Sequence, residues 1–167
     1  MTGAVLLLSV VTLERVAELW LARRNTAALM ARGACEVAAG HYPLIVALHA
    51  LWLGSLWYFG AGQQVHPGWL AVFLILQLGR IWVLGTLKDR WTTRIIVLPG
   101  ETLVASGPYR WVSHPNYVVV VGEIAVLPLC LGLPVLALVF TIANAAVLWV
   151  RITAESAALR GIPRAAT

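Results

Sequence analysis

Charged side chains are scarce in this 167-residue chain, and long apolar runs take their place. Only 11% of the residues are charged and 60% are hydrophobic, whereas about a quarter of the residues in a soluble domain are charged. The mean hydropathy of +0.85 agrees with this bias. The composition therefore excludes an ordinary soluble domain and predicts an all-α integral membrane protein with a single domain, residues 1–167.

Cysteine and histidine are too few and too scattered to predict a metal site. Cys35 and Cys130 form no CxxC pair, and the four histidines form no HExxH motif. Cys35 lies in a polar stretch and Cys130 in an apolar run, so we expect no disulfide. The formal charge of +5 comes without any basic run interleaved with aromatic residues, so nucleic acid is not a predicted partner.

Apolar stretches of membrane-spanning length occur about five times. A helix needs about 20 mostly apolar residues to cross a bilayer. The predicted spans are residues 3–22, 43–60, 67–87, 115–132 and 134–152. The last four begin at proline, which suits the first turn of a helix. The connection at residues 132–134 is so short that the last two spans must form an antiparallel hairpin.

Basic residues gather in alternate connections. They follow the first, third and fifth spans, whereas residues 61–66 and 132–134 contain neither Lys nor Arg. By the positive-inside rule, the N-terminus is predicted to lie outside and the C-terminus in the cytoplasm of a bacterial cell, with the chain in the plasma membrane. The long connection 88–113 is then cytoplasmic.

This long connection has its own pattern. A β-branched run at residues 94–98 and a second run at residues 102–105 flank a Pro-Gly-Glu turn. Two short strands about a turn fit the pattern, so we predict a small hairpin at the membrane surface that caps a cavity.

Residues 107–117 concentrate groups that can bind a ligand. They include Arg110, His114, Asn116 and two tyrosines, and their glycine and prolines prevent one continuous helix. Polar backbone at a membrane surface is usually retained because it lines a cavity or binds something. The alternative is a loop that only starts the next span. The cluster of an imidazole, a guanidinium and two phenols favours a binding site.

The fifth span adds polar groups to this stretch. Asn144, Arg151 and Glu155 are spaced i, i+7 and i+11, so they share one helical face. The short hairpin brings Arg151 and Glu155 to the same end of the bundle as residues 110–117. Such a mixture of positive, negative and amide groups suits a zwitterionic ligand, although Arg151 and Glu155 are also spaced to pair with each other.

Ionisable residues inside the other spans are costly unless they are paired or face a cavity. Glu14 and Glu18 share one face of the first span, and Arg80 in the third span offers either of them a partner. Glu123 and His49 lie where a lipid head group can enter from the side, and they suit a base or hydrogen-bond acceptor for its hydroxyl. Packing of Glu123 against Arg80 is the alternative.

The polar motifs carry a family resemblance. Gly107-Pro-Tyr-Arg110, His114-Pro-Asn-Tyr117 and Arg151-Ile-Thr-Ala-Glu155 resemble the isoprenylcysteine carboxyl methyltransferase family. Members of that family bind S-adenosylmethionine between the last helices and the cytoplasmic loops, so the resemblance implies this cofactor and a motif-bearing catalytic region at residues 88–160. The implied cofactor-binding residues are Gly107, Pro108, Tyr109, Arg110, His114, Pro115, Asn116, Tyr117 and Glu155.

The catalytic residues that we predict are Glu123, Arg151 and His49. Arg151 matches the arginine that precedes the C-terminal glutamate of the family. Ser156 departs from the pattern, because many members have a second glutamate there, so no role of that second carboxylate carries over.

Two further segments resemble a bacterial branch of the family. Residues Tyr42–His49 and Trp91–Pro99, together with Glu123, are similar to small proteins associated with type III polyketide synthases. This resemblance implies O-methylation of an alkylresorcinol or alkylpyrone that enters from the membrane lipids, with a polyketide synthase upstream. The alternatives are carboxyl methylation of an isoprenylcysteine, N-methylation of a phospholipid, and a small membrane scaffold without enzymatic activity.

Overall fold

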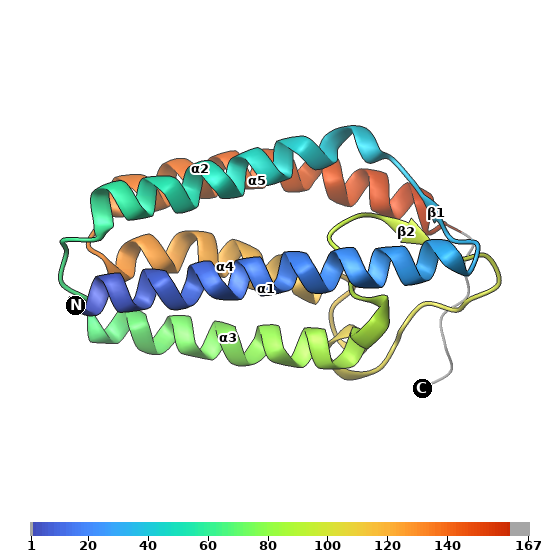
Figure 1. Ribbon diagram of the computed structural model, residues 1–167, viewed down its shortest axis with the longest axis horizontal. Helices are drawn as coiled ribbons and strands as arrows, with labels where there is room; N and C mark the ends of the chain where they lie inside the picture. The colour runs from blue at the N-terminus through green and yellow to red at the C-terminus, as the bar shows by residue number, and fades with distance from the viewer. Residues whose placement is uncertain (1, 161–167) are drawn as a thin grey trace.

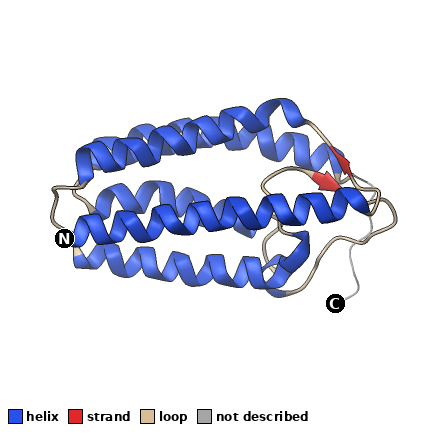
Figure 2. Ribbon diagram, in the orientation of Figure 1, coloured by secondary structure: helices blue, strands red, loops and turns tan. Residues whose placement is uncertain are grey.

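The computed structural model describes residues 2–160, which form an all-helical bundle with short loops at one end and long ones at the other (Figure 1). The long helices are α1 (Gly3–Ala31), α2 (Tyr42–Gly60), α3 (Pro67–Leu87), α4 (Pro115–Cys130) and α5 (Pro134–Ala158). The minor elements are the 3-10 helices η1 (Ala39–His41), η2 (Lys88–Arg90) and η3 (Gly107–Arg110) and the strands β1 (Cys35–Glu36) and β2 (Ile96–Val97). Figure 2 shows that helix dominates and that the two strands lie at the long-loop end.

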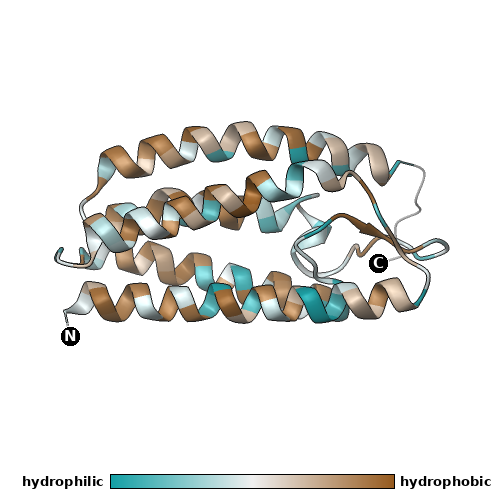
Figure 3. Ribbon diagram, turned by 45° about the horizontal axis from the view of Figure 1, so that its top comes forward, coloured by the Kyte–Doolittle hydropathy of each residue, from teal (hydrophilic) through white to brown (hydrophobic). Residues whose placement is uncertain are grey.

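Within residues 2–160, three segments are long and apolar enough to cross a membrane: Ala39–Gly60, Pro67–Arg90 and Pro134–Ala158. Helix α4 is apolar but has 16 residues, and α1 has 29 residues interrupted by Glu14, Arg15 and Glu18. Hydrophobic colouring runs along much of the helical ribbon in Figure 3, while the most hydrophilic helical residues lie from the middle of the bundle toward the long-loop end. The fold supports an integral membrane protein, and five crossings remain a prediction.

Local signals set most of the helix starts. Proline occupies the first or second position of α2, α3, α4 and α5, where its missing N–H removes no intrahelical hydrogen bond. Helix α1, in contrast, continues well beyond the predicted end at residue 22. Hydropathy fades there, but residues 23–31 include alanine, leucine, methionine and arginine, which all form helices readily.

A tight turn joins α4 to α5 and makes them antiparallel, as predicted (Figure 1). The Leu133 amide donates to the Pro128 carbonyl at 2.9 Å, and Gly132 adopts a left-handed conformation with φ of +67°. Glycine takes this conformation without the steric penalty of a side chain. The turn therefore carries the long-loop ends of α4 and α5 to the same end of the bundle.

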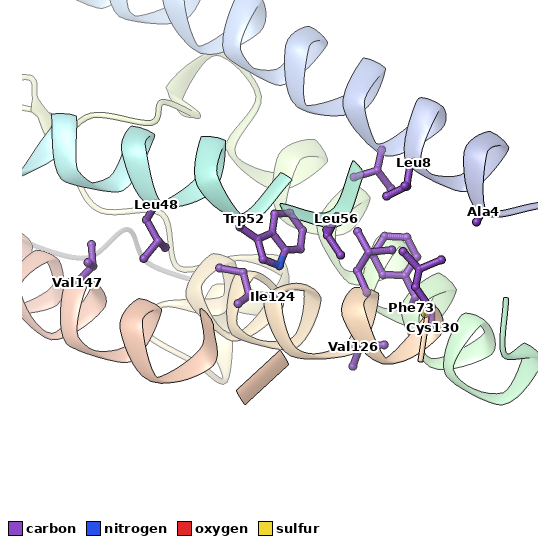
Figure 4. Packing of buried hydrophobic residues seen from close by; sticks show 13 residues of the cluster. Ala4, Leu8, Leu48, Trp52, Leu56, Phe73, Ile124, Val126, Cys130 and Val147 are labelled. Atoms are coloured by element: carbon purple, nitrogen blue, oxygen red, sulfur yellow. The ribbon is translucent and has the colours of Figure 1, made fainter. Parts of the chain in front are cut away.

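Apolar side chains from the long helices fill the centre of the bundle (Figure 4). Leu8, Trp52, Leu56, Ile124 and Leu127 are at most 3% exposed and come from α1, α2 and α4. Because lipid tails are as apolar as these side chains, close packing rather than removal from water holds such helices together.

Helices α3 and α4 approach each other closely at a glycine. A Cβ atom added to Gly122 would lie 2.7 Å from the Leu76 side chain. Small residues at a helix interface allow this close approach.

A network of ion pairs joins α1, α3 and α4 in the half of the bundle nearer the long loops. The Arg80 guanidinium donates two hydrogen bonds to Glu18, one of them at 2.6 Å, and one to Glu123 at 2.9 Å. Arg15 lies 3.1 Å from Glu18 and 3.4 Å from Glu123. The predicted pairing of Arg80 with Glu18 is confirmed, and Glu123 packs against Arg80 as the alternative interpretation proposed.

The predicted hairpin of residues 94–98 and 102–105 is confirmed only in part: the chain turns, with the Glu101 amide donating to the Leu98 carbonyl at 3.3 Å, but the second run contributes an isolated bridge residue, Leu103, and no strand. Strand β2 does form within the first run, but it pairs antiparallel with β1, with Cys35 opposite Val97 and Glu36 opposite Ile96. Arg94 donates to Glu36 at 2.7 Å beside this pairing. The second run is held differently, because Arg90 donates to the carbonyl of Thr102 at 2.9 Å.

The ion network predicts that Arg80→Gln is strongly destabilising. Removal of one member of a buried ion pair leaves its partners uncompensated and typically costs about 3–5 kcal/mol. We expect a lower melting temperature in detergent, partly restored in the double variant Arg80→Gln/Glu123→Gln. Arg24→Gln is the matched control, because Arg24 is exposed and its ion pair within residues 2–160 is with exposed Asp89 at 3.7 Å. Equal melting temperatures for the Arg80 and Arg24 variants would contradict the network's structural role.

Candidate cofactor and active site

A cavity of about 240 Å³ lies at the long-loop end of the bundle. Its wall is built from the C-terminal ends of α1, α3 and α5, the start of α4 and the connection between α3 and α4. Apolar side chains contribute Leu29, Leu87, Trp91, Ile95, Ile96, Val97, Leu98, Leu103, Val104 and Leu159. Polar side chains contribute Arg90, Thr92, Arg94, Glu101, Thr102, Tyr109, Ser113, His114, Asn116, Tyr117, Arg151 and Glu155.

A chain of hydrogen bonds connects α4 and α5 in the wall of the cavity. Arg151 Nε donates to the Tyr117 hydroxyl at 2.7 Å, and that hydroxyl donates to Glu155. The His114 ring stacks on Tyr117 with a centroid distance of 5.3 Å, and its Nδ1 lies 3.8 Å from Glu155 Oε1. The chain fixes the position of the Glu155 carboxylate and the orientation of the phenol.

The start of α4 presents a second acceptor to the cavity. His114 is the N-cap residue and Pro115 begins the helix, which places Asn116 in its first turn. Asn116 Oδ1 is buried and has no hydrogen-bond partner among the described residues. A buried acceptor without a partner is unfavourable, so this oxygen suits a ligand that donates a hydrogen bond.

Helix η3 brings Tyr109 to the cavity because Gly107 lies close to α3. Gly107 has φ of +57°, and an added Cβ would lie 2.4 Å from Thr86 Oγ1. That hydroxyl is itself held by the Trp82 carbonyl at 2.8 Å. Burial raises the pKa of the Tyr109 phenol, and the nearby Glu155 charge raises it further, so the hydroxyl stays protonated as a hydrogen-bond donor.

Ion pairs hold the loop that forms the outer wall of the cavity. Glu101 accepts hydrogen bonds from Arg90 and Arg32. The Arg90 hydrogen bond, with a contribution from Arg32, lowers the pKa of the Glu101 carboxyl, so this contact persists below the ordinary titration range of glutamate.

Helix α1 and the same loop also make a buried contact. Asn25 Nδ2 donates to the carbonyls of Lys88 at 3.1 Å and Trp91 at 2.9 Å.

The structure brings six of the predicted site residues to the cavity: Tyr109, His114, Asn116, Tyr117, Arg151 and Glu155. Gly107, Pro108 and Pro115 shape the backbone beside it, and Arg110 is exposed outside the lining. Glu123 lies in the ion network, and His49 Nδ1 is within 2.9 Å of the Ile45 carbonyl, so neither lines the cavity.

Sequence reasoning missed the apolar wall. Trp91 and Ile95 are buried, and the segment from Ile95 to Leu98 lines the cavity. The β-branched run was visible in the sequence, but it predicted a cap over a cavity rather than side chains inside it.

The sequence of the chain matches a known protein family. Residues 69–161, more than half of the chain, match the sequence model of the isoprenylcysteine carboxyl methyltransferase (ICMT) family. The chain belongs to this family. It is also 41% identical over 160 residues to the uncharacterized protein YpbQ of Bacillus subtilis (strain 168), covering 93% of this chain and 95% of the relative. No solved structure matches.

ICMT-family methyltransferases use S-adenosylmethionine. The hydrogen-bond acceptors and apolar side chains that line the cavity fit that molecule. Its amines and ribose hydroxyls need acceptors, which Asn116 Oδ1 and the Glu155 carboxylate supply. Its adenine ring needs an apolar surface, which Trp91, Ile95 and Leu98 supply. The residues present therefore fit the cofactor of the family.

We predict that Glu155→Gln weakens binding of S-adenosylmethionine on the order of tenfold or more. A hydrogen bond to a charged group contributes about 1.5–3 kcal/mol, and the amide cannot replace the carboxylate charge. Calorimetry on purified wild type and variant measures the change. Asp89→Asn is the control, since Asp89 is a highly exposed acid outside the cavity lining. Unchanged affinity in Glu155→Gln would return Glu155 to a purely structural role.

Proposed function

We propose that the protein is an S-adenosylmethionine-dependent O-methyltransferase that acts on a lipidic hydroxyl, such as that of an alkylresorcinol or alkylpyrone. Family membership implies a membrane methyltransferase. The observation that carries the proposal is the Arg151–Tyr117–Glu155 chain in the wall of a cavity that combines apolar and polar side chains at the end of apolar helices. A lipid held in the bilayer reaches such a site without leaving its hydrophobic surroundings.

Roles within the cavity follow from the chemistry of each side chain. Glu155 and Asn116 accept hydrogen bonds from the cofactor, and the Tyr109 and Tyr117 hydroxyls fix polar groups around it. When bound, the cofactor supplies an activated methyl group for in-line displacement. The protein contributes alignment and exclusion of water, which such a displacement needs more than it needs acid catalysis.

The charges around the cavity favour a hydroxyl acceptor. A carboxylate acceptor arrives ionised and needs a cation, but Arg90 and Arg94 already bind Glu101 and Glu36. The second candidate function, carboxyl methylation of an isoprenylcysteine, is supported by one observation. Arg151 is a buried cation in the cavity wall and can orient a carboxylate.

Glu123 can act as a catalytic base only if the methyl acceptor enters between α1, α3 and α4. Glu123 lies seven residues beyond Asn116, roughly 10 Å along α4, and it accepts hydrogen bonds from Arg80 and Arg15. A base must be within hydrogen-bond reach of the proton that it removes. His49 requires the same route of entry.

The membrane arrangement that we propose places the cavity on the cytoplasmic side, with five crossings and the N-terminus outside. The support is the basic residues in and just after the last third of α1 and those that follow α3 and α5. The resemblance of residues Tyr42–His49 and Trp91–Pro99 supports an upstream reaction of the polyketide synthase class, which makes long-chain phenols.

The test is methyl transfer to defined acceptors. Membranes containing the protein are incubated with methyl-labelled S-adenosylmethionine and either a long-chain alkylresorcinol or a farnesylated cysteine. We expect label in the resorcinol as a phenol ether, which resists alkali, and none when the variant is Glu155→Ala.

Label only in the cysteine, released by alkali as methanol, would replace the proposed acceptor with a carboxylate. If neither the wild type nor the control variant Asp89→Asn transfers label to either acceptor, both candidate functions are contradicted.

A further inference from the structure

The exposed apolar surface of α3 is shorter than the helix. The first and last large apolar residues that α3 exposes are Trp69 and Trp82, which are 44% and 50% exposed. They lie 13 residues apart, and a helix rises about 1.5 Å per residue, so this interval is about 20 Å long. The last five residues of α3, 83–87, expose no large apolar side chain.

Three other helices have nearly the same limits. Their intervals are Leu6–Trp20 on α1, Leu44–Phe59 on α2 and Val135–Val150 on α5, and each rises about 21–23 Å. Met30 on α1 is the one exposed large apolar residue of these helices that lies beyond its interval. We call the exposed large apolar residues of the four intervals the apolar band.

Contacts at the short-loop end place the four intervals at one height. Thr2 Oγ1 donates to the Ala61 carbonyl at 3.0 Å, which joins the start of α1 to the end of α2. The His66 amide donates to the Cys130 carbonyl at 2.8 Å, which joins the start of α3 to the turn between α4 and α5. The apolar band is therefore one continuous zone across the bundle.

Aromatic residues mark both limits of the apolar band. They are Tyr58, Phe59 and Trp69 at the short-loop limit and Trp20, Trp82 and Trp149 at the long-loop limit. Tryptophan and tyrosine concentrate at the two interfaces between a membrane and water. The apolar band thus has the composition of a surface that meets lipid between two such interfaces.

Basic side chains lie just beyond the long-loop limit. The Trp111 ring packs against the Trp82 ring with a centroid distance of 5.6 Å, which holds the exposed Arg110 near this limit. Arg23 and Lys88 are also exposed, within two helical turns beyond it. Cationic side chains at a membrane surface attract anionic lipid head groups. The layer of head groups is therefore expected at this height.

The apolar band is shorter than an ordinary bilayer is thick. The hydrocarbon core of a typical bilayer measures about 30 Å, so the band falls short by about 7–10 Å. A hydrophobic surface that is too short is accommodated when the bilayer thins, when flanking side chains extend to the interface, or when copies associate. The band continues over four helices, whereas a second copy would cover one side of it.

The position of the cavity favours thinning. Leu87 and Glu155 line the cavity and lie five residues beyond Trp82 and Val150, which is about 8 Å beyond the apolar band. Acyl chains of an ordinary bilayer that began at the short-loop limit would reach this height. A thinner hydrocarbon core leaves the cavity among the head groups, where a water-soluble cofactor and a lipidic acceptor can both reach it.

We propose that the apolar band binds a locally thinned bilayer and fits lipids with short acyl chains best. The hydrocarbon core next to the protein then matches the band, and the cavity lies in the head-group layer. This inference rests on the membrane arrangement of the proposed function, but it does not depend on the identity of the methyl acceptor.

Brominated phosphatidylcholine tests the proposal, because bromine on an acyl chain quenches the fluorescence of a tryptophan that it contacts. The full chain is reconstituted in vesicles that mix dibromostearoyl phosphatidylcholine with dimyristoleoyl, dioleoyl or dierucoyl phosphatidylcholine. The lipid that binds the apolar band best displaces the quencher best. We expect the short dimyristoleoyl chains to displace it about twofold or more better than the long dierucoyl chains.

A longer apolar band should shift this preference toward longer chains. The double variant Gly85→Leu/Thr153→Leu extends the band by about 5 Å, since both positions are exposed and lie three residues beyond Trp82 and Val150. Neither residue lines the cavity. Gly54→Leu is the matched control. It adds the same side chain inside the band, and an added Cβ at Gly54, as at Gly85, meets no atom within 4 Å.

Two results with the wild type would overturn the proposal. One is equal displacement by the three lipids, or better displacement by dierucoyl phosphatidylcholine. The other is the absence of quenching in every mixture, which would mean that protein, such as a second copy, covers the apolar band. The expected chain-length preference together with no methyl transfer would support the proposal and count against the proposed function alone.

Discussion

The turn between α4 and α5 is the constraint on which the candidate site depends. Because Leu133 donates to the Pro128 carbonyl and Gly132 is left-handed, the two helices reverse direction within three residues. The start of α4 then lies beside the second half of α5, which is the longer helix with 25 residues against 16. The hydrogen bonds from Arg151 to Tyr117 and from Tyr117 to Glu155 form at that level. No soluble cofactor domain is needed, since two helix ends and one loop supply the polar groups.

The sequence predicts those parts of the structure that depend on local signals. Prolines at residues 67, 115 and 134 mark helix starts because proline in a first turn costs no hydrogen bond. The meeting of Tyr117 with Arg151 and Glu155 follows from the short connection between their helices. These steps require no knowledge of distant contacts.

The strand pairing depends on distant contacts, and the prediction failed there. Strand β2 has the composition of a strand, but its partner β1 lies 62 residues earlier by the Cys35–Val97 register. The Pro-Gly-Glu turn does form, but the strand that precedes it pairs with β1, and the Glu101 side chain binds Arg32 and Arg90. No periodicity in residues 94–105 encodes that choice.

The bundle contains two clusters of polar side chains, and their surroundings differ. The cavity residues combine acceptors, phenols and apolar walls, as expected for binding a small molecule. The network around Arg80 combines charges that satisfy one another, as expected for joining helices in a membrane. Asn116 and Glu123 lie seven residues apart on α4, but Asn116 lines the cavity whereas Glu123 belongs to the ion network. The intervening distance separates them, which sequence periodicity alone does not reveal.

Photochemical cross-linking of the cofactor tests the central claim most directly. The purified protein is irradiated with labelled S-adenosylmethionine, and the label is mapped by mass spectrometry, with S-adenosylhomocysteine as competitor. The account predicts competable label on residues of the cavity wall, within 91–117 or 151–159. Label confined to α2 or to the ion network, or label that the competitor does not reduce, would contradict it.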